Sequence, residues 1–176
     1  MALVSDFTVR AICSLTNALD LSTPVDALSL TQRIQLTSGT GANQADMLWH
    51  DQRTLTASAT EDLDLAASLT SSFGATLTFA RIKALIVVAA SANTKNVQVT
   101  RPASNGVPLF LAAGDGIPVL PGGVFAWVAP NAAGVAVTAD TGDLLTFTNS
   151  AGSTSVTYDV VTSCVSDDRE NVTLVE

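Results

Sequence analysis

The fold is decided by the stretch from Pro121 to Val165, which reads PGGVFAWVAPNAAGVAVTADTGDLLTFTNSAGSTSVTYDVVTSCV. Turn-forming residues punctuate it at intervals of about ten residues, namely at Pro121–Gly123, Asn131–Gly134, Asp140–Asp143 and Ser150–Ser153. Short runs with high β-propensity lie between these turns, at 124–128, 135–138, 144–148 and 155–165. Short strands separated by regular turns are typical of an antiparallel meander or of half a β-sandwich.

Upstream of this stretch, apolar and polar residues alternate with the period of a strand. Leu28, Leu30, Ile34 and Leu36 share one face of the segment 28–37, which predicts a half-buried strand. Phe7 to Cys13 alternates in the same way and predicts an N-terminal strand before the turn-prone segment 20–24.

The segment 76–88 gives the strongest strand signal. One face is wholly apolar and predicts the core side, with Ala80, Ile82, Ala84, Ile86 and Val88. On the other face Phe79, Leu85 and Val87 flank Arg81 and Lys83, so we expect a loop or a neighbouring subunit to cover it. The segment 101–121 holds four of the six prolines and predicts an ordered loop with at most short strands.

These patterns predict an all-β protein, an antiparallel β-sandwich of jelly-roll-like form with little helix beyond short turns near 63–72. The expected organisation is an N-terminal strand or arm over 1–26, a sandwich domain over 27–165 and an acidic tail over 166–176. A length of 176 residues suits one domain with its own core.

Composition excludes several classes of protein. The net charge is −8 with 8 Lys and Arg against 16 Asp and Glu, so a nucleic-acid partner is not expected. The N-terminus lacks the pattern of an export signal, and the longest apolar run, 84–90, is too short to cross a bilayer as a helix. We therefore expect no export and no membrane partner.

The sequence shows no recognisable catalytic, cofactor or metal motif. His50 is the one histidine, and no Gly-x-Ser-x-Gly elbow accompanies it, so we predict a structural or interface role and not an enzyme. Asp62 and Asp64 are better explained as solvated carboxylates than as ligands of a hard cation. Cys13 and Cys164 are interpreted as small buried thiols, with a bridge between the chain ends as the alternative.

Two aromatic residues, Trp49 and Trp127, raise the question of a sugar-binding platform. Such a platform presents aromatic faces outward, whereas tryptophan more often serves in a core or a subunit contact. Core or interface packing is therefore the preferred interpretation for both.

Several segments resemble small structural proteins of tailed bacteriophages and prophages. The resemblance covers about residues 27–165 and lies in Thr37–Asp46, Trp49–Leu55, Glu61–Leu65, Phe73–Lys83, Pro121–Phe125, Ala139–Leu145 and Ser155–Asp159. It contains no catalytic or ligand motif. It implies a virion component, and an acidic β-sandwich of this size looks most like a capsid decoration or cement protein on the exterior of the head.

The resemblance implies a passive task, in which the chain binds over junctions of the major capsid protein and forms a homo-oligomer. Alternatives are a tail, neck or head–tail connector component, or a glycan-binding tail module. The contact residues we expect are Arg53, Arg81, Lys83, Arg101 and its loop to Pro121, together with Trp49, Trp127 and the terminal arms. No catalytic, cofactor or metal residue is assigned.

Overall fold

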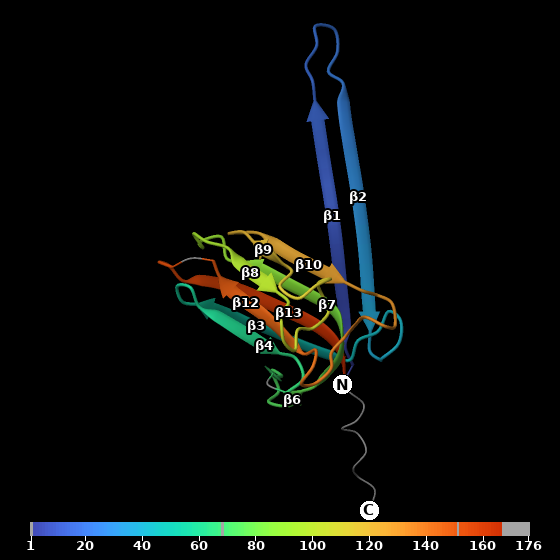
Figure 1. Cartoon of the computed structure of the whole chain (residues 1–176). Coiled ribbons are helices and arrows are strands. Elements are labelled where there is room, and N and C mark those ends of the chain that lie inside the picture. The colour runs from blue at the N-terminus through green and yellow to red at the C-terminus, as the bar shows by residue number, and fades with distance from the viewer. Residues whose placement is uncertain (1, 68, 151, 167–176) are drawn as a thin grey trace, which may run out of the picture.

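The protein is all-β, as the sequence predicts. A computed structural model describes residues 2–67, 69–150 and 152–166, and within these ranges it contains thirteen strands and no helix. The strands are antiparallel to their neighbours and form two sheets, a small hairpin and a long projecting hairpin. The result is a β-sandwich with an arm (Figure 1).

The first sheet has the order β10-β7-β13-β3, and β11 pairs with one end of β7. Its strands are β3 (Met47–Leu55), β7 (Phe79–Ala89), β10 (Val124–Val128), β11 (Val135–Ala136) and β13 (Val156–Ser166). The second sheet has the order β4-β12-β8-β9. Its strands are β4 (Thr60–Asp64), β8 (Val97–Thr100), β9 (Gly116–Val119) and β12 (Leu144–Asn149), and β5 (Leu69–Thr70) pairs with β6 (Thr76–Leu77) beside them.

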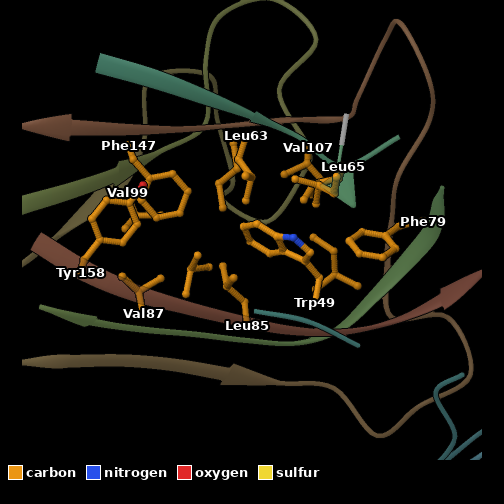
Figure 2. Close-up of a cluster of buried hydrophobic side chains, with 14 of the residues drawn as sticks. Trp49, Leu63, Leu65, Phe79, Leu85, Val87, Val99, Val107, Phe147 and Tyr158 are labelled. Atoms are coloured by element: carbon orange, nitrogen blue, oxygen red, sulfur yellow. The ribbon is translucent and has the colours of Figure 1, made fainter. Parts of the chain in front are cut away.

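The core fills the space between the two sheets (Figure 2). Trp49 and Leu85 from the first sheet point toward Leu63 from the second, and all three are buried. Phe147 stacks on Tyr158 across the layers, with ring centroids 4.8 Å apart and an interplanar angle of 9°. Burial of these large side chains supplies most of the stability of such a sandwich.

The strands between Pro121 and Val165 form where the turns predict, but they are not a meander. β12 belongs to the second sheet, whereas β10, β11 and β13 belong to the first. Turn residues mark where the chain reverses and leave the partner strand unspecified. Here the connections around β12 cross between the sheets, which places β13 between β7 and β3.

The prediction of the core face of β7 holds at Ile82, which belongs to the core cluster, and is wrong from Leu85 onward. Leu85, Val87 and Ala89 face the core, while Ile86 and Val88 on the opposite face are only half-buried. Ser163 and Cys164 of β13 pair with Ala84 and Ile82, so Lys83 is an extra residue, a β-bulge that shifts the alternation. A strict period of two therefore assigns the faces incorrectly along this strand.

The N-terminal segment forms one long hairpin that projects from one end of the sandwich (Figure 1). β1 (Val4–Thr16) pairs with β2 (Val25–Thr37) in register over the full length of both strands. The expected boundary between 26 and 27 therefore falls inside the hairpin, and residues 27–37 belong to the arm. Leu28 and Leu30 are 54% and 55% exposed, so the expectation of a half-buried strand holds only near its end, at Ile34 and Leu36.

Two further expectations concern the ends of the chain. Cys13 is exposed on the arm and Cys164 is buried in β13, and both are free, so the interpretation of buried thiols holds for Cys164 alone and no bridge joins them. The acidic tail, apart from Ser166, lies outside the described residues.

Candidate assembly interface

The arm has two chemically different faces. Cross-strand partners share a face of a two-stranded ribbon, and successive residues alternate between faces. The pairs Phe7–Ile34, Ala11–Leu30 and Cys13–Leu28 therefore lie on one face. We call this the apolar arm face and define it by Phe7, Val9, Ala11, Cys13, Leu15, Leu28, Leu30 and Ile34. Its two polar members are Gln32, opposite Val9, and Asp26, opposite Leu15 near the tip.

The apolar arm face begins against the sandwich and continues into solvent. At the root, Ser5 and Ser163 of β13 are joined by a hydrogen bond of 3.1 Å between their hydroxyls, and Leu36 is fully buried. Farther out, Val9 is 61% exposed and Leu15 is 71% exposed. The same face is therefore buried at the root of the arm and exposed toward its tip.

The opposite face, which we call the polar arm face, carries charged and hydroxyl groups. Asp6 and Arg33 form an ion pair across the two strands. Hydrogen bonding from the Arg33 guanidinium holds the pKa of Asp6 below its ordinary value, although both groups are in solvent. Thr8, Arg10, Ser14, Ser29 and Thr31 continue this face toward the tip. Ile12 and Val25 are exposed apolar residues on the same face, so it is mainly but not wholly polar.

The tip of the arm presents two leucines. The chain reverses between Asn17 and Pro24, where the Asn17 amide donates to the Pro24 carbonyl at 3.2 Å. The Leu19 amide donates to the Ser22 carbonyl at 2.8 Å, which closes a tight turn. Leu19 is 55% exposed and Leu21 fully exposed. Leucines in a solvated turn are unusual, because turns favour polar residues and glycine.

The energetics of an isolated hairpin indicate that the arm is more stable when another protein surface covers it. An isolated two-stranded hairpin is at best marginally stable in water, and its outer edges expose unpaired amide and carbonyl groups. Exposed apolar surface of this extent on a soluble protein marks an interaction site. The arm is therefore the candidate interface of this molecule.

A largely apolar hollow of about 500 Å³ lies at the root of the arm. It is formed where the start of the chain meets one end of β3 and the segment 71–77, and its lining includes Leu3, Leu48, His50, Phe73 and Leu77. Phe73 is 81% exposed and Leu48 is 41% exposed. This hollow lies beside the start of β1, whereas the tip leucines lie in the turn between Asn17 and Pro24, so the two are at opposite ends of the arm.

Of two contact residues expected from the sequence, Trp49 belongs to the interior of the sandwich and Arg53 is half-buried beside it. Trp49 is buried in the core, and the Arg53 guanidinium lies over its ring at 5.5 Å from the centroid. Arg53 also pairs with Glu61 at 3.2 Å and with Asp51 at 3.2 Å. Their arrangement stabilises the sheet, and Trp49 presents no outward face for a sugar.

Lys83 and Arg81 hold loops together. The Lys83 ammonium is buried and donates to the carbonyl oxygens of Asn131 and Gly41. Burial, with a smaller contribution from nearby Arg81, lowers the pKa of Lys83. Arg81 donates to the Thr40 carbonyl at 3.2 Å. The mixed face of β7 is covered by loops of its own chain at this point, which is one of the two covers that the sequence suggests.

Arg101 and Trp127 are likewise engaged within the chain. Arg101 donates to the carbonyls of Phe110 and Leu111 at 3.1 and 3.4 Å and thereby orders the loop that precedes β9. Trp127 is half-buried and packs against the core cluster. The six expected contact residues are thus not gathered on one surface.

Several polar side chains of types that can act in catalysis or metal binding are hydrogen-bonded within the fold. Asp62 accepts a hydrogen bond from the Thr146 hydroxyl at 2.5 Å, and Asp64 accepts from the amides of Ala66 and Ala67. Tyr158 donates to Glu61, and burial together with this contact raises the pKa of Tyr158. His50 is exposed on β3 at the rim of the root hollow. Among the residues that the structure describes, no three His, Cys, Asp or Glu side chains form a group able to hold a metal ion.

The arm as an interface was only partly visible in the sequence. Two alternating segments flanking the turn-prone stretch 20–24 are a hairpin signal, and the sequence does place a strand in each. What alternation leaves open is whether the apolar face packs on its own domain. The leucines of the tip, Leu19 and Leu21, were the available hint.

Comparison with known protein families, with characterised proteins and with solved structures gives no match. Within the described residues, no helix is long and apolar enough to span a membrane.

Proposed function

We propose that this chain is a structural virion protein, a capsid decoration or cement subunit with a jelly-roll-like body, which binds over junctions of major capsid subunits and stabilises the head. The observation that supports this proposal best is the projecting arm with its exposed apolar face. A polypeptide surface of this kind is suited to burial against another protein and offers little to a small-molecule substrate.

A subunit that stabilises a shell must contact more than one neighbour at once. The arm spans about 40 Å, since each antiparallel strand residue rises about 3.4 Å. It therefore provides a contact surface well separated from that of the sandwich. Two separate weak contacts on a single lattice reinforce each other, because the second forms at a high effective concentration.

The charge balance supports the same function. A net charge of −8 favours attachment to a basic patch on a shell and disfavours adhesion to packaged DNA. The groups that could suggest catalysis or sugar binding, such as Asp62 and Trp49, are engaged in hydrogen bonds or in the core.

The test is the copy number of this chain relative to the major capsid protein, measured by quantitative mass spectrometry of purified virions. A ratio of one, or a simple fraction of it, is the expected result for a decoration protein. A handful of copies per particle would overturn the decoration assignment in favour of the tail, neck or connector alternative. Complete absence from the particle would overturn the structural proposal itself.

A further inference from the structure

We propose that the apolar arm face is covered by the same face of a second copy of this chain, with the two arms packed antiparallel so that each tip reaches the root of the other. This inference rests on the proposed function in treating the arm as an assembly element, and it goes further by naming the partner and the geometry.

The first argument is the area that such a contact buries. The part of the apolar arm face that the sandwich leaves uncovered runs from Val9 to Leu15 and measures about 20 Å by 10 Å, from the strand rise, the strand spacing and the width of the side chains. A single arm lying there on a flat foreign surface would bury about 400 Å² in total, well below the roughly 1,200 Å² of a specific interface. Antiparallel arms add the contact of each tip with the other root, so they bury more surface than such a flat contact.

The second argument is that the chain carries both halves of the additional contact. The tip offers the exposed side chains of Leu19 and Leu21. The root offers the hollow of about 500 Å³ lined by Leu48 and Phe73, among others. In an antiparallel pair of equal arms, each tip arrives at the other root, so both leucine tips are seated by one two-fold operation. An interface of this kind is isologous and closes on itself.

The third argument is electrostatic and selects the antiparallel orientation. The arm strands and their turn, 4–37, carry Arg10 and Arg33 against Asp6, Asp20 and Asp26, so the arm is nearly neutral and most of the charge of −8 belongs to the rest of the chain. Parallel arms would bring two acidic bodies together. Antiparallel arms place the bodies about an arm length apart, well beyond the Debye length of about 8 Å at physiological salt.

The first experiment compares two double variants of the purified full chain by sedimentation equilibrium. Leu28→Asp with Leu30→Asp introduces two carboxylates on the apolar arm face. Ser29→Asp with Thr31→Asp introduces the same charge on the polar arm face of the same strand. All four positions are exposed, so both variants are expected to keep the sandwich fold, which near-UV circular dichroism verifies.

The wild type should sediment as a dimer of 18.1 kDa chains. The apolar-face variant should dissociate at least about 100-fold more readily, because burying an unpaired carboxylate carries a large desolvation penalty. The polar-face variant should remain a dimer. A wild type that is monomeric at 100-micromolar concentration, roughly the range of weak association, would overturn the inference, as would two variants that dissociate equally.

The second experiment tests the orientation by cross-linking in a Cys13→Ser background. Chains with Leu21→Cys are mixed with chains with Leu48→Cys and oxidised gently. The expected product is a disulfide between the two kinds of chain, formed only in the mixture. In the unsubstituted protein, efficient cross-linking through Cys13, which lies on the apolar arm face, would instead indicate parallel arms and would contradict the proposed geometry.

These results are separable from the test of the proposed function. A chain that is abundant in virions yet monomeric in solution would retain its function and lose this inference. A chain that dimerises through its arms yet is absent from virions would retain the inference and lose the function.

Discussion

At the scale of single residues, three ionisable side chains with reactive groups are buried and hydrogen-bonded within the fold. Lys83 donates to backbone carbonyls, and Tyr158 donates to Glu61. Cys164 is wholly buried in β13 beside the Thr162 hydroxyl, at 3.0 Å. Groups of this kind make stability depend on pH, because their pKa values differ between the folded and unfolded chains.

Cys164 gives the sharpest pH prediction. Burial raises the pKa of its thiol from 9.0 to about 12. Between these values the unfolded chain loses the proton while the folded chain keeps it, so the free energy of unfolding falls by about 1.4 kcal/mol per pH unit. Below pH 9 the contribution of this group is fully present.

The measurement is urea unfolding of the wild type and of Cys164→Ala between pH 8 and pH 11, with Cys13→Ser in both chains. The difference in free energy of unfolding between the two should shrink steadily above pH 9. Parallel pH profiles for the two chains would contradict this assignment.

Gly134 offers a test of backbone constraint. It has a φ of 55°, and a Cβ placed there would lie 2.5 Å from the carbonyl oxygen of Ile82. Gly134→Ala should therefore lower the free energy of unfolding by about 3 kcal/mol or more, because of backbone strain and displacement of the loop against β7. Gly114, with a φ of 85° and nothing within 4 Å, is the matched control and should cost about 1 to 2 kcal/mol as alanine. If thermal unfolding shows the same loss of free energy of unfolding for Gly134→Ala and Gly114→Ala, the contact with Ile82 is unimportant.

At the scale of elements, the sequence predicts strand positions better than it predicts their partners. The run 124–128 coincides with β10, because turn residues and β-branched residues mark its ends. The faces of β7 could not be assigned correctly along the whole strand, since the bulge at Lys83 depends on pairing with β13, about 80 residues away. The arm interface is a further case, because alternation in 28–37 is the same whether its apolar face meets a core or another molecule.

The arm also predicts a pattern of amide hydrogen exchange. In the dimer, the amides of 9–16 and 25–32 should be protected by the partner arm. In Leu28→Asp with Leu30→Asp they should exchange at least about tenfold faster, because a lone hairpin opens readily. Amides of β13 should be equally protected in both chains, since this strand is paired on both sides. Mass spectrometry after proteolysis resolves these segments, and slow exchange of the variant arm would argue against a partner.

At the scale of the whole molecule, the arm and the sandwich should be separable. Replacing residues 9–32 with Asn-Gly keeps the pair Thr8–Arg33 and closes a two-residue hairpin on it. The buried root residue Leu36 and the core remain intact. We expect a monomeric protein whose Tm differs from that of the Leu28→Asp, Leu30→Asp chain by no more than about 4 °C. A large drop in Tm would show that the outer arm stabilises the sandwich directly.

The central position of β13 also determines the order in which this protein can be made. Its partners β3 and β7 emerge from the ribosome well before it, and β13 is the last strand of the sandwich to be synthesised. The arm, by contrast, pairs two segments joined by a short turn and can close early in translation. The first sheet cannot form completely until β13 has been synthesised, which happens near the end of translation. A premature stop between Thr37 and Val156 therefore yields a polypeptide that has both arm strands and lacks the central strand of the first sheet.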